Sequence, residues 1–147
     1  MSLYFTLTRR KICFISLTFI IICMVSAEFF HIYAYEIDGS SAEARADFAK
    51  EIGCDINDKK NYSSRTITIP QEFSKLYDGY NKLQLEAGFD LSSYKGCEVL
   101  VYTYPSVKYD GLNGETQLNL LVYRGRVIGG DISETSIGGK MLPLYFE

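Results

Sequence analysis

Hydrophobic positions are most concentrated near the N-terminus, where an uncharged run covers residues 12–27. The basic residues 9–11 precede this run, and Glu28 is the first acidic residue of the chain. A membrane-spanning helix needs about 20 apolar residues, whereas the core of a signal peptide has about 7–15. The run lies between these lengths, so it predicts either a membrane anchor or a secretory signal.

Two interpretations of this segment stay open. In the first, which we favour, the helix extends over residues 12–33 and remains as an anchor, with the aromatic residues of 29–35 at the membrane interface. In the second, cleavage near Ala27 releases a secreted chain. The basic residues on the N-terminal side favour a cytoplasmic N-terminus in both cases. We therefore expect residues 1–35 to be a stub with an anchor, and the rest to lie outside the cytoplasm.

Helical periodicity appears after a linker at residues 36–41. The first helix is expected to begin at Ser40, because Ser40 and Glu43 have the spacing of a capping box, in which each side chain binds an unpaired backbone amide. Apolar residues then recur at helical steps, and Gly53 provides a stop, since glycine takes the left-handed conformation at little cost.

A second amphipathic helix is predicted by apolar residues at three- and four-residue steps over residues 73–87. Pro70 suits its first turn, and Thr68 and Gln71 have the spacing of a second capping box. Gly88 is the expected stop.

Strands are predicted where β-branched and aromatic residues alternate or form short apolar runs. The segment 97–104 is apolar on both faces, which is typical of a central strand. A tight turn at Arg124 and Gly125 joins the last two strands. The predicted strands are 54–56, 65–69, 97–104, 116–123 and 126–128.

The order of these elements predicts an α+β domain over residues 42–147. We expect a mainly antiparallel sheet of about four or five strands, with both helices packed on one face.

The charge of the chain argues against one class of partner, nucleic acids. All 18 acidic residues but 12 of the 15 basic residues follow Ala27, a net charge of −6. Nucleic-acid binding is therefore not expected, because phosphate recognition needs a clustered basic surface.

Three motifs carry a family resemblance, and the last is the most specific. They are Ile69-Pro70-Gln71-Glu72-Phe73, Gly88-Phe89-Asp90-Leu91-Ser92, and Leu121-Val122-Tyr123-Arg124-Gly125-Arg126-Val127-Ile128-Gly129-Gly130-Asp131. In this order, behind a membrane segment, they resemble a bacterial family catalogued as a domain of unknown function, serial number 4830.

The resemblance covers residues 43–144. It implies a short, single-anchor protein of a Gram-positive anaerobe with an α+β domain, and it implies no activity or catalytic residue. One position departs from the family pattern, since Cys54 stands where an aromatic residue is expected.

Candidate catalytic chemistry is sparse. His31 is the single histidine and lies in the anchor segment, so histidine triads and histidine metal sites are excluded from the domain. Asp131 and Glu134 are candidates for an acid/base pair or for ligands of a divalent cation, although solvated acids are the ordinary interpretation. Arg124 and Arg126 flank the hairpin and are candidates for binding an anion, although solubilising charges are the ordinary interpretation. No cofactor or resident metal is expected.

Two cysteines, Cys54 and Cys97, lie outside the apolar run. Outside the cytoplasm they could form a disulfide, and two buried thiols are the favoured alternative. No C-x-x-C motif occurs, which argues against redox catalysis.

These observations favour a membrane-anchored, extracytoplasmic binding or interaction module without catalysis, whose partner is a protein or another cell-envelope component. The alternative is a carboxylate-dependent hydrolase or metal-binding protein that uses Asp131 and Glu134. A third interpretation, a secreted ligand carrier, requires cleavage after Ala27.

Overall fold

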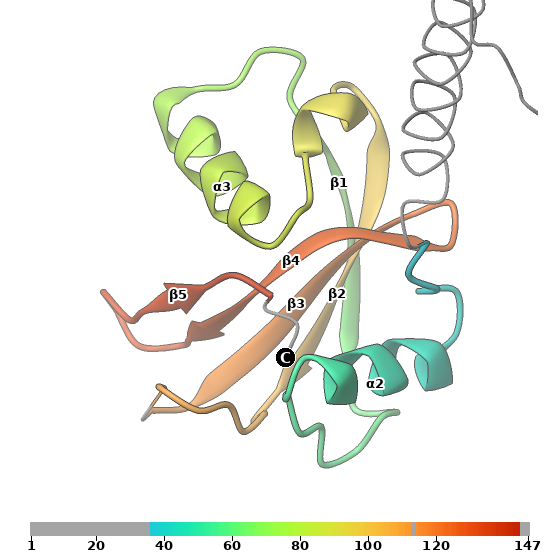
Figure 1. Cartoon of the computed structure of the whole chain (residues 1–147), viewed down its shortest axis with the longest axis vertical. Helices are drawn as coiled ribbons and strands as arrows, with labels where there is room; N and C mark the ends of the chain where they lie inside the picture. The colour runs from blue at the N-terminus through green and yellow to red at the C-terminus, as the bar shows by residue number, and fades with distance from the viewer. Residues whose placement is uncertain (1–35, 113, 145–147) are drawn as a thin grey trace, which may run out of the picture. The chain divides into compact units, whose positions relative to one another are not determined.

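A computed structural model describes residues 36–112 and 114–144 of the chain (Figure 1). One compact unit begins at Ile37. No helix of the described residues has the length and apolar character needed to cross a membrane. The predicted anchor, residues 12–33, lies outside the described residues.

The described part is an α+β domain built on one antiparallel sheet, as the sequence predicts. Its strands follow the chain order β1-β2-β3-β4-β5 across the sheet. The strands are β1 (Ser63–Thr68), β2 (Glu98–Pro105), β3 (Thr116–Tyr123), β4 (Arg126–Glu134) and β5 (Met141–Leu142). The helices are α2 (Ala42–Glu51), α3 (Lys75–Glu86) and the short 3-10 helix η1 (Leu91–Tyr94).

The tight turn between β3 and β4 is confirmed. Arg124 and Gly125 have φ angles of 50° and 82°, and Tyr123 pairs with Arg126 across the turn. Two consecutive residues with positive φ match the turn type that suits the right-handed twist of a β-hairpin. This turn sets the register of β3 against β4 as far as the pair Val122 and Val127, beyond which a register shift precedes the pair Leu121 and Gly129.

The first face of the sheet packs against α2. Leu118, Leu120 and Val122 of β3 belong to one core with Phe48 and Ile52 of α2. Leu144, near the C-terminal end of the described residues, completes this core and is fully buried.

The second face packs against α3 and η1. Leu121, next to Leu120 in β3, belongs to a separate core with Leu91 of η1. Tyr77 and Tyr80 of α3 pack on this second core. Figure 1 shows α2 and α3 lying apart with strands of the sheet between them.

The prediction that both helices pack on one face is therefore wrong. The physical reason lies in the central strands, because β3 is buried along almost its entire length. Successive side chains of a strand point to opposite faces, so a strand that is buried on both faces needs cover on both. One helix cannot supply that cover, and α2 and α3 divide the two faces.

Both predicted capping boxes are also wrong. The N-cap of α2 is Ser41, whose hydroxyl accepts a hydrogen bond from the Ala44 amide at 3.0 Å, one residue after Ser40. The N-cap of α3 is Ser74, well beyond Thr68. Both stops are confirmed, since Gly53 and Gly88 have φ angles of 71° and 80°.

The remaining segments differ in detail from the prediction. Residues 54–56 form no strand, only an isolated bridge from Asp55 to Lys108. The last predicted strand, 126–128, extends to Glu134 in β4. A register shift between Leu121 and Val122 marks an irregularity where β3 meets β4.

Candidate functional site

The sheet face that packs against α3 changes from apolar to polar along the strands. Thr103 of β2 pairs with Asn119 of β3, and Asn119 pairs with Asp131 of β4. In the next row Gln117 pairs with Ser133. Because side chains alternate with a period of two, these residues share the face of Leu121. We call Thr103, Gln117, Asn119, Asp131 and Ser133 the polar ladder.

Hydrogen bonds connect the polar ladder across three strands and to α3. Thr103 Oγ1 donates to Asn119 Oδ1 at 2.8 Å, and Asn119 Nδ2 donates to Asp131 Oδ2 at 2.9 Å. The Tyr80 hydroxyl donates to Asp131 Oδ1, also at 2.9 Å. Asp131 therefore has a neutral donor on each carboxylate oxygen.

Asp131 is a buried acid, with only 3% of its surface exposed. Burial raises the pKa of its carboxyl, because removal from water penalises the charged form. Hydrogen bonds from Asn119, Tyr80 and Ser133 and the charge of Arg65 act in the opposite direction and only partly offset this effect. Within the described part of the chain, no ion pair neutralises this carboxylate.

A cavity of about 280 Å³ lies between the polar ladder and α3. This volume is just below the range for small-molecule sites, about 300–1,000 Å³. The Tyr77 hydroxyl is buried and makes no hydrogen bond within the described residues. Charged and polar groups that line the cavity include Arg65, Tyr77, Tyr80, Asn119 and Asp131.

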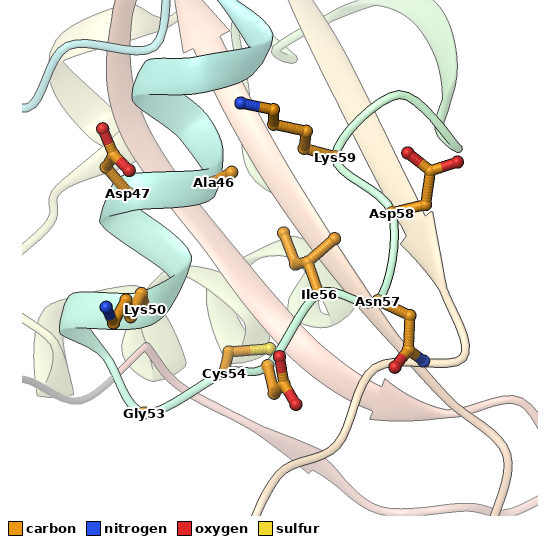
Figure 2. Close-up of a pocket in the computed structure, with 10 residues that line it drawn as sticks. Ala46, Asp47, Lys50, Gly53, Cys54, Ile56, Asn57, Asp58 and Lys59 are labelled. Carbon is orange, nitrogen blue, oxygen red and sulfur yellow. The ribbon is translucent and has the colours of Figure 1, made fainter.

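A second and larger hollow, of about 650 Å³, lies between α2 and the loop at residues 53–59 (Figure 2). In Figure 2, Asp47 and Lys50 project from α2, while Asp58 and Lys59 project from the facing loop. These side chains are exposed, and their charges are mixed. Exposed charges of both signs are solvated by water, so this hollow lacks the convergent buried polar groups of a binding site.

Cys54 lines this hollow but is 1% exposed. Burial raises the pKa of its thiol to about 12, which keeps the sulfur protonated and poorly nucleophilic at neutral pH. Cys97 is partly buried and packs on the other core, across the sheet. Both cysteines are free. The candidate disulfide is therefore wrong, because the two thiols lie on opposite faces.

The predicted pair of acids is separated by the sheet. Asp131 and Glu134 are three residues apart in β4, and an odd spacing places side chains on opposite faces. Asp131 contacts Tyr80 of α3, whereas Glu134 Oε2 accepts a hydrogen bond from the Lys140 amide at 3.0 Å. Among the described residues, no three His, Cys, Asp or Glu side chains gather closely enough to hold a metal ion.

The two candidate arginines lie at the β3–β4 hairpin and do not line the cavity. Both are exposed. The guanidinium of Arg124 lies 5.0 Å from the ring of Tyr123, and Arg126 forms a backbone bridge with Asp38. Of the candidate residues, only Asp131 belongs to the polar ladder.

Sequence reasoning missed the residues that surround Asp131. A signal was present in the segment 117–122, where Gln117 and Asn119 interrupt an otherwise apolar strand on a single face. Polar side chains on one face of a largely buried strand are unusual, and they indicate a polar network or a site. The roles of Arg65 and Tyr77 had no such signal, because they depend on where α3 and β1 lie.

Comparison of the chain with family models, with curated proteins and with solved structures finds no match in any of the three. The family resemblance drawn from the three motifs therefore stays a prediction.

Proposed function

We propose that the protein is a membrane-anchored binding module of the cell envelope, and that the polar ladder and its cavity form its ligand site. The apolar run at residues 12–27, with its basic flank, supports the anchor and the extracytoplasmic location of the domain. The observation that carries the binding role is Asp131, a buried carboxylate that lines a cavity and lacks an ion-pair partner in the described residues.

Binding is favoured over catalysis by the placement of the acids. A hydrolase of the predicted kind needs two carboxyl groups that act on one substrate. Asp131 and Glu134 lie on opposite faces of β4, so this pair cannot meet at one bond. The oxygens of Asp131 instead accept hydrogen bonds from Tyr80 and Asn119, which hold the carboxylate in one orientation.

A cross-linking pull-down tests this proposal. The tagged full-length chain is recovered from its own membranes after mild cross-linking, and the intact mass of the chain is measured. We expect an uncleaved N-terminus and a reproducible envelope partner. A mass that begins at Glu28 would refute the anchor.

Two variants test whether the ladder is the binding site. Gln117→Ala removes a half-buried ladder amide whose one hydrogen bond, to Ser133, is long at 3.5 Å, so the fold should survive. Asp47→Ala changes the other hollow and is the control. We expect the first variant to lose the partner and the second to keep it. Equal recovery by both variants would refute the ladder as the site.

A further inference from the structure

Two opposite charges line the cavity without pairing with each other. Arg65 of β1 is exposed, and within the described residues its guanidinium makes no hydrogen bond or ion pair. Asp131 of β4 is buried and has only neutral hydrogen-bond donors. Burial raises the pKa of both Asp131 and Tyr80, and the positive charge of Arg65 partly offsets this effect, so Arg65 is near enough to act on groups in the cavity. The cavity therefore has a negative end and a positive end.

The two charged residues lie on the same face of the sheet but in strands that are not neighbours. Three strand spacings lie between β1 and β4, which is about 14 Å at about 4.8 Å per spacing. The long side chain of Arg65 spans part of this distance. In the described residues no ion pair joins the two charges, and a molecule whose own charges are several bonds apart can contact both.

The wall between the charged ends is mixed. Val101 and Leu121 supply an apolar surface, and the buried Tyr77 hydroxyl supplies a hydrogen-bonding group that has no partner in the described residues. A buried hydroxyl without a partner is costly, so a ligand that hydrogen-bonds to it gains affinity. A volume of about 280 Å³ admits only a small molecule.

We infer that the cavity binds a dipeptide-sized zwitterion, with its ammonium group at Asp131 and its carboxylate at Arg65. This inference rests on the proposed binding function and names its ligand class, a short peptide with free ends. The Tyr77 hydroxyl accepts a hydrogen bond from the ammonium group, and the small side chains lie against Val101 and Leu121. Charge-assisted hydrogen bonds at both ends select against peptides with blocked termini.

Calorimetric titration of the full-length chain in mild detergent tests the inference. The probes are alanylalanine, its N-acetyl form, which lacks the ammonium group, and its amide, which lacks the carboxylate. We expect acetylation to weaken binding about tenfold or more, because it leaves the buried carboxylate of Asp131 without a cation. Amidation should weaken binding less, since Arg65 is exposed and screened by solvent.

Variants assign each end of the ligand. Asp131→Asn should remove the preference for a free ammonium group, and Arg65→Gln should remove the preference for the acid over the amide. Arg126→Gln, an exposed arginine outside the cavity, is the matched control and should change neither. Should Asp131→Asn fail to fold, the Arg65→Gln comparison still decides, because Arg65 is exposed.

The possible failures are distinguishable. Equal affinity for alanylalanine and its N-acetyl form, or no binding of alanylalanine at all, would overturn the ligand class. If Gln117→Ala nevertheless loses the envelope partner, the proposed binding function stands with a different ligand. If that variant keeps the partner as well, the proposed function fails too.

Discussion

Among the residues that the structure describes, two charged side chains are buried, and they lie on opposite faces of one sheet. Arg45 of α2 is 2% exposed, and Asp131 of β4 is 3% exposed. Burial of a charge is expensive unless protein groups replace the lost water. The surroundings of the two side chains compensate for burial in different ways. The difference indicates a structural role for Arg45 and a ligand-binding role for Asp131.

Arg45 is surrounded by groups that satisfy it. Its Nε donates to the Tyr104 hydroxyl at 2.9 Å, and its Nη1 donates to the Gly39 carbonyl at 2.8 Å. The guanidinium lies 3.6 Å from the centre of the Tyr102 ring and 5.0 Å from that of Tyr62. Cation–π contacts with aromatic faces replace an acidic partner here. This arrangement ties α2 to the sheet.

Asp131 has hydrogen bonds but forms no ion pair with any residue that the structure describes. It also lines a cavity, together with an arginine that makes no ion pair in the described residues. A buried charge enclosed by its own partners indicates a structural role, whereas one that lines a cavity indicates a ligand. The predictions below test this distinction, from the largest expected effect to the smallest.

Truncation of the structural charge should have the largest effect. Arg45→Ala leaves the Tyr104 hydroxyl and the Gly39 carbonyl without their donor and opens a void between the rings. We expect the free energy of unfolding to fall by about 3 kcal/mol, measured by urea denaturation. Asp47→Ala on the same helix is exposed and should change it by less than about 0.5 kcal/mol. A loss below about 1 kcal/mol for Arg45→Ala would contradict the structural role.

Two neighbouring tyrosines of α3 form a matched pair on the other face. Tyr80→Phe removes the hydrogen bond to Asp131 and should destabilise the domain by about 1.5 kcal/mol. Tyr77→Phe removes a buried hydroxyl that has no partner in the described residues, so stability should stay the same or rise slightly. Thermal unfolding compares the two variants. If both lose equal stability, the Tyr77 hydroxyl already has a partner and is not reserved for a ligand.

Asp131 should also make stability depend on pH. Because the pKa of this carboxyl is raised in the folded state above its ordinary value of 3.8, the folded protein holds the proton more tightly than the unfolded chain does. The stabilising contribution is fully present below that value and is lost as pH rises through the folded pKa. Each unit of difference corresponds to about 1.4 kcal/mol.

The comparison is between the wild-type protein and Asp131→Asn, which has no titrating group at this position. Unfolding free energies from about pH 4 to about pH 7 should show the wild type losing stability relative to the variant as pH rises. A difference that stays constant, or that changes in the other direction, would mean that burial does not dominate the energetics of Asp131.

The smallest expected effect is a difference in alkylation between the two cysteines, which lie on opposite faces of the sheet. Iodoacetamide at about pH 8 should label Cys97, which is partly buried, and spare Cys54, whose thiol has a pKa raised to about 12 and is 1% exposed. Peptide mass mapping reports each site separately, and unfolding in urea should release Cys54. Equal labelling of both in the folded protein would show that the core beneath α2 opens readily.

Local patterns were enough to predict much of the fold from sequence. The helical period of α3, the alternation in β3 and the turn at Arg124 and Gly125 each depend on residues close together in the chain. The sequence pattern predicts the wrong N-caps because more than one serine or threonine near each helix start can cap it. Ser40 precedes the actual cap Ser41, and Thr68 precedes the actual cap Ser74. The distribution of the helices between two faces was missed because it depends on how the whole sheet is covered.

The site was harder to predict for the same reason. The sequence identifies Asp131 as a candidate, but it offers Glu134, a near neighbour in the chain, as the partner. Its actual contact, Tyr80, is 51 residues away and reaches it only because α3 packs on that face. Arg65 lines the cavity from an edge strand. The spacing of residues along the chain predicts neither the Tyr80 hydrogen bond nor the position of Arg65.

One titration tests the central claim, that the face of Asp131 binds a ligand and the face of Arg45 does not. Isotope-labelled full-length protein in mild detergent is followed by NMR while alanylalanine is added. We predict that the side-chain amide signals of Asn119 and Gln117 shift and saturate, while the Nε–H signal of Arg45 stays in place. Shifts at Arg45 without shifts in the polar ladder, or no shift in either, would contradict the account.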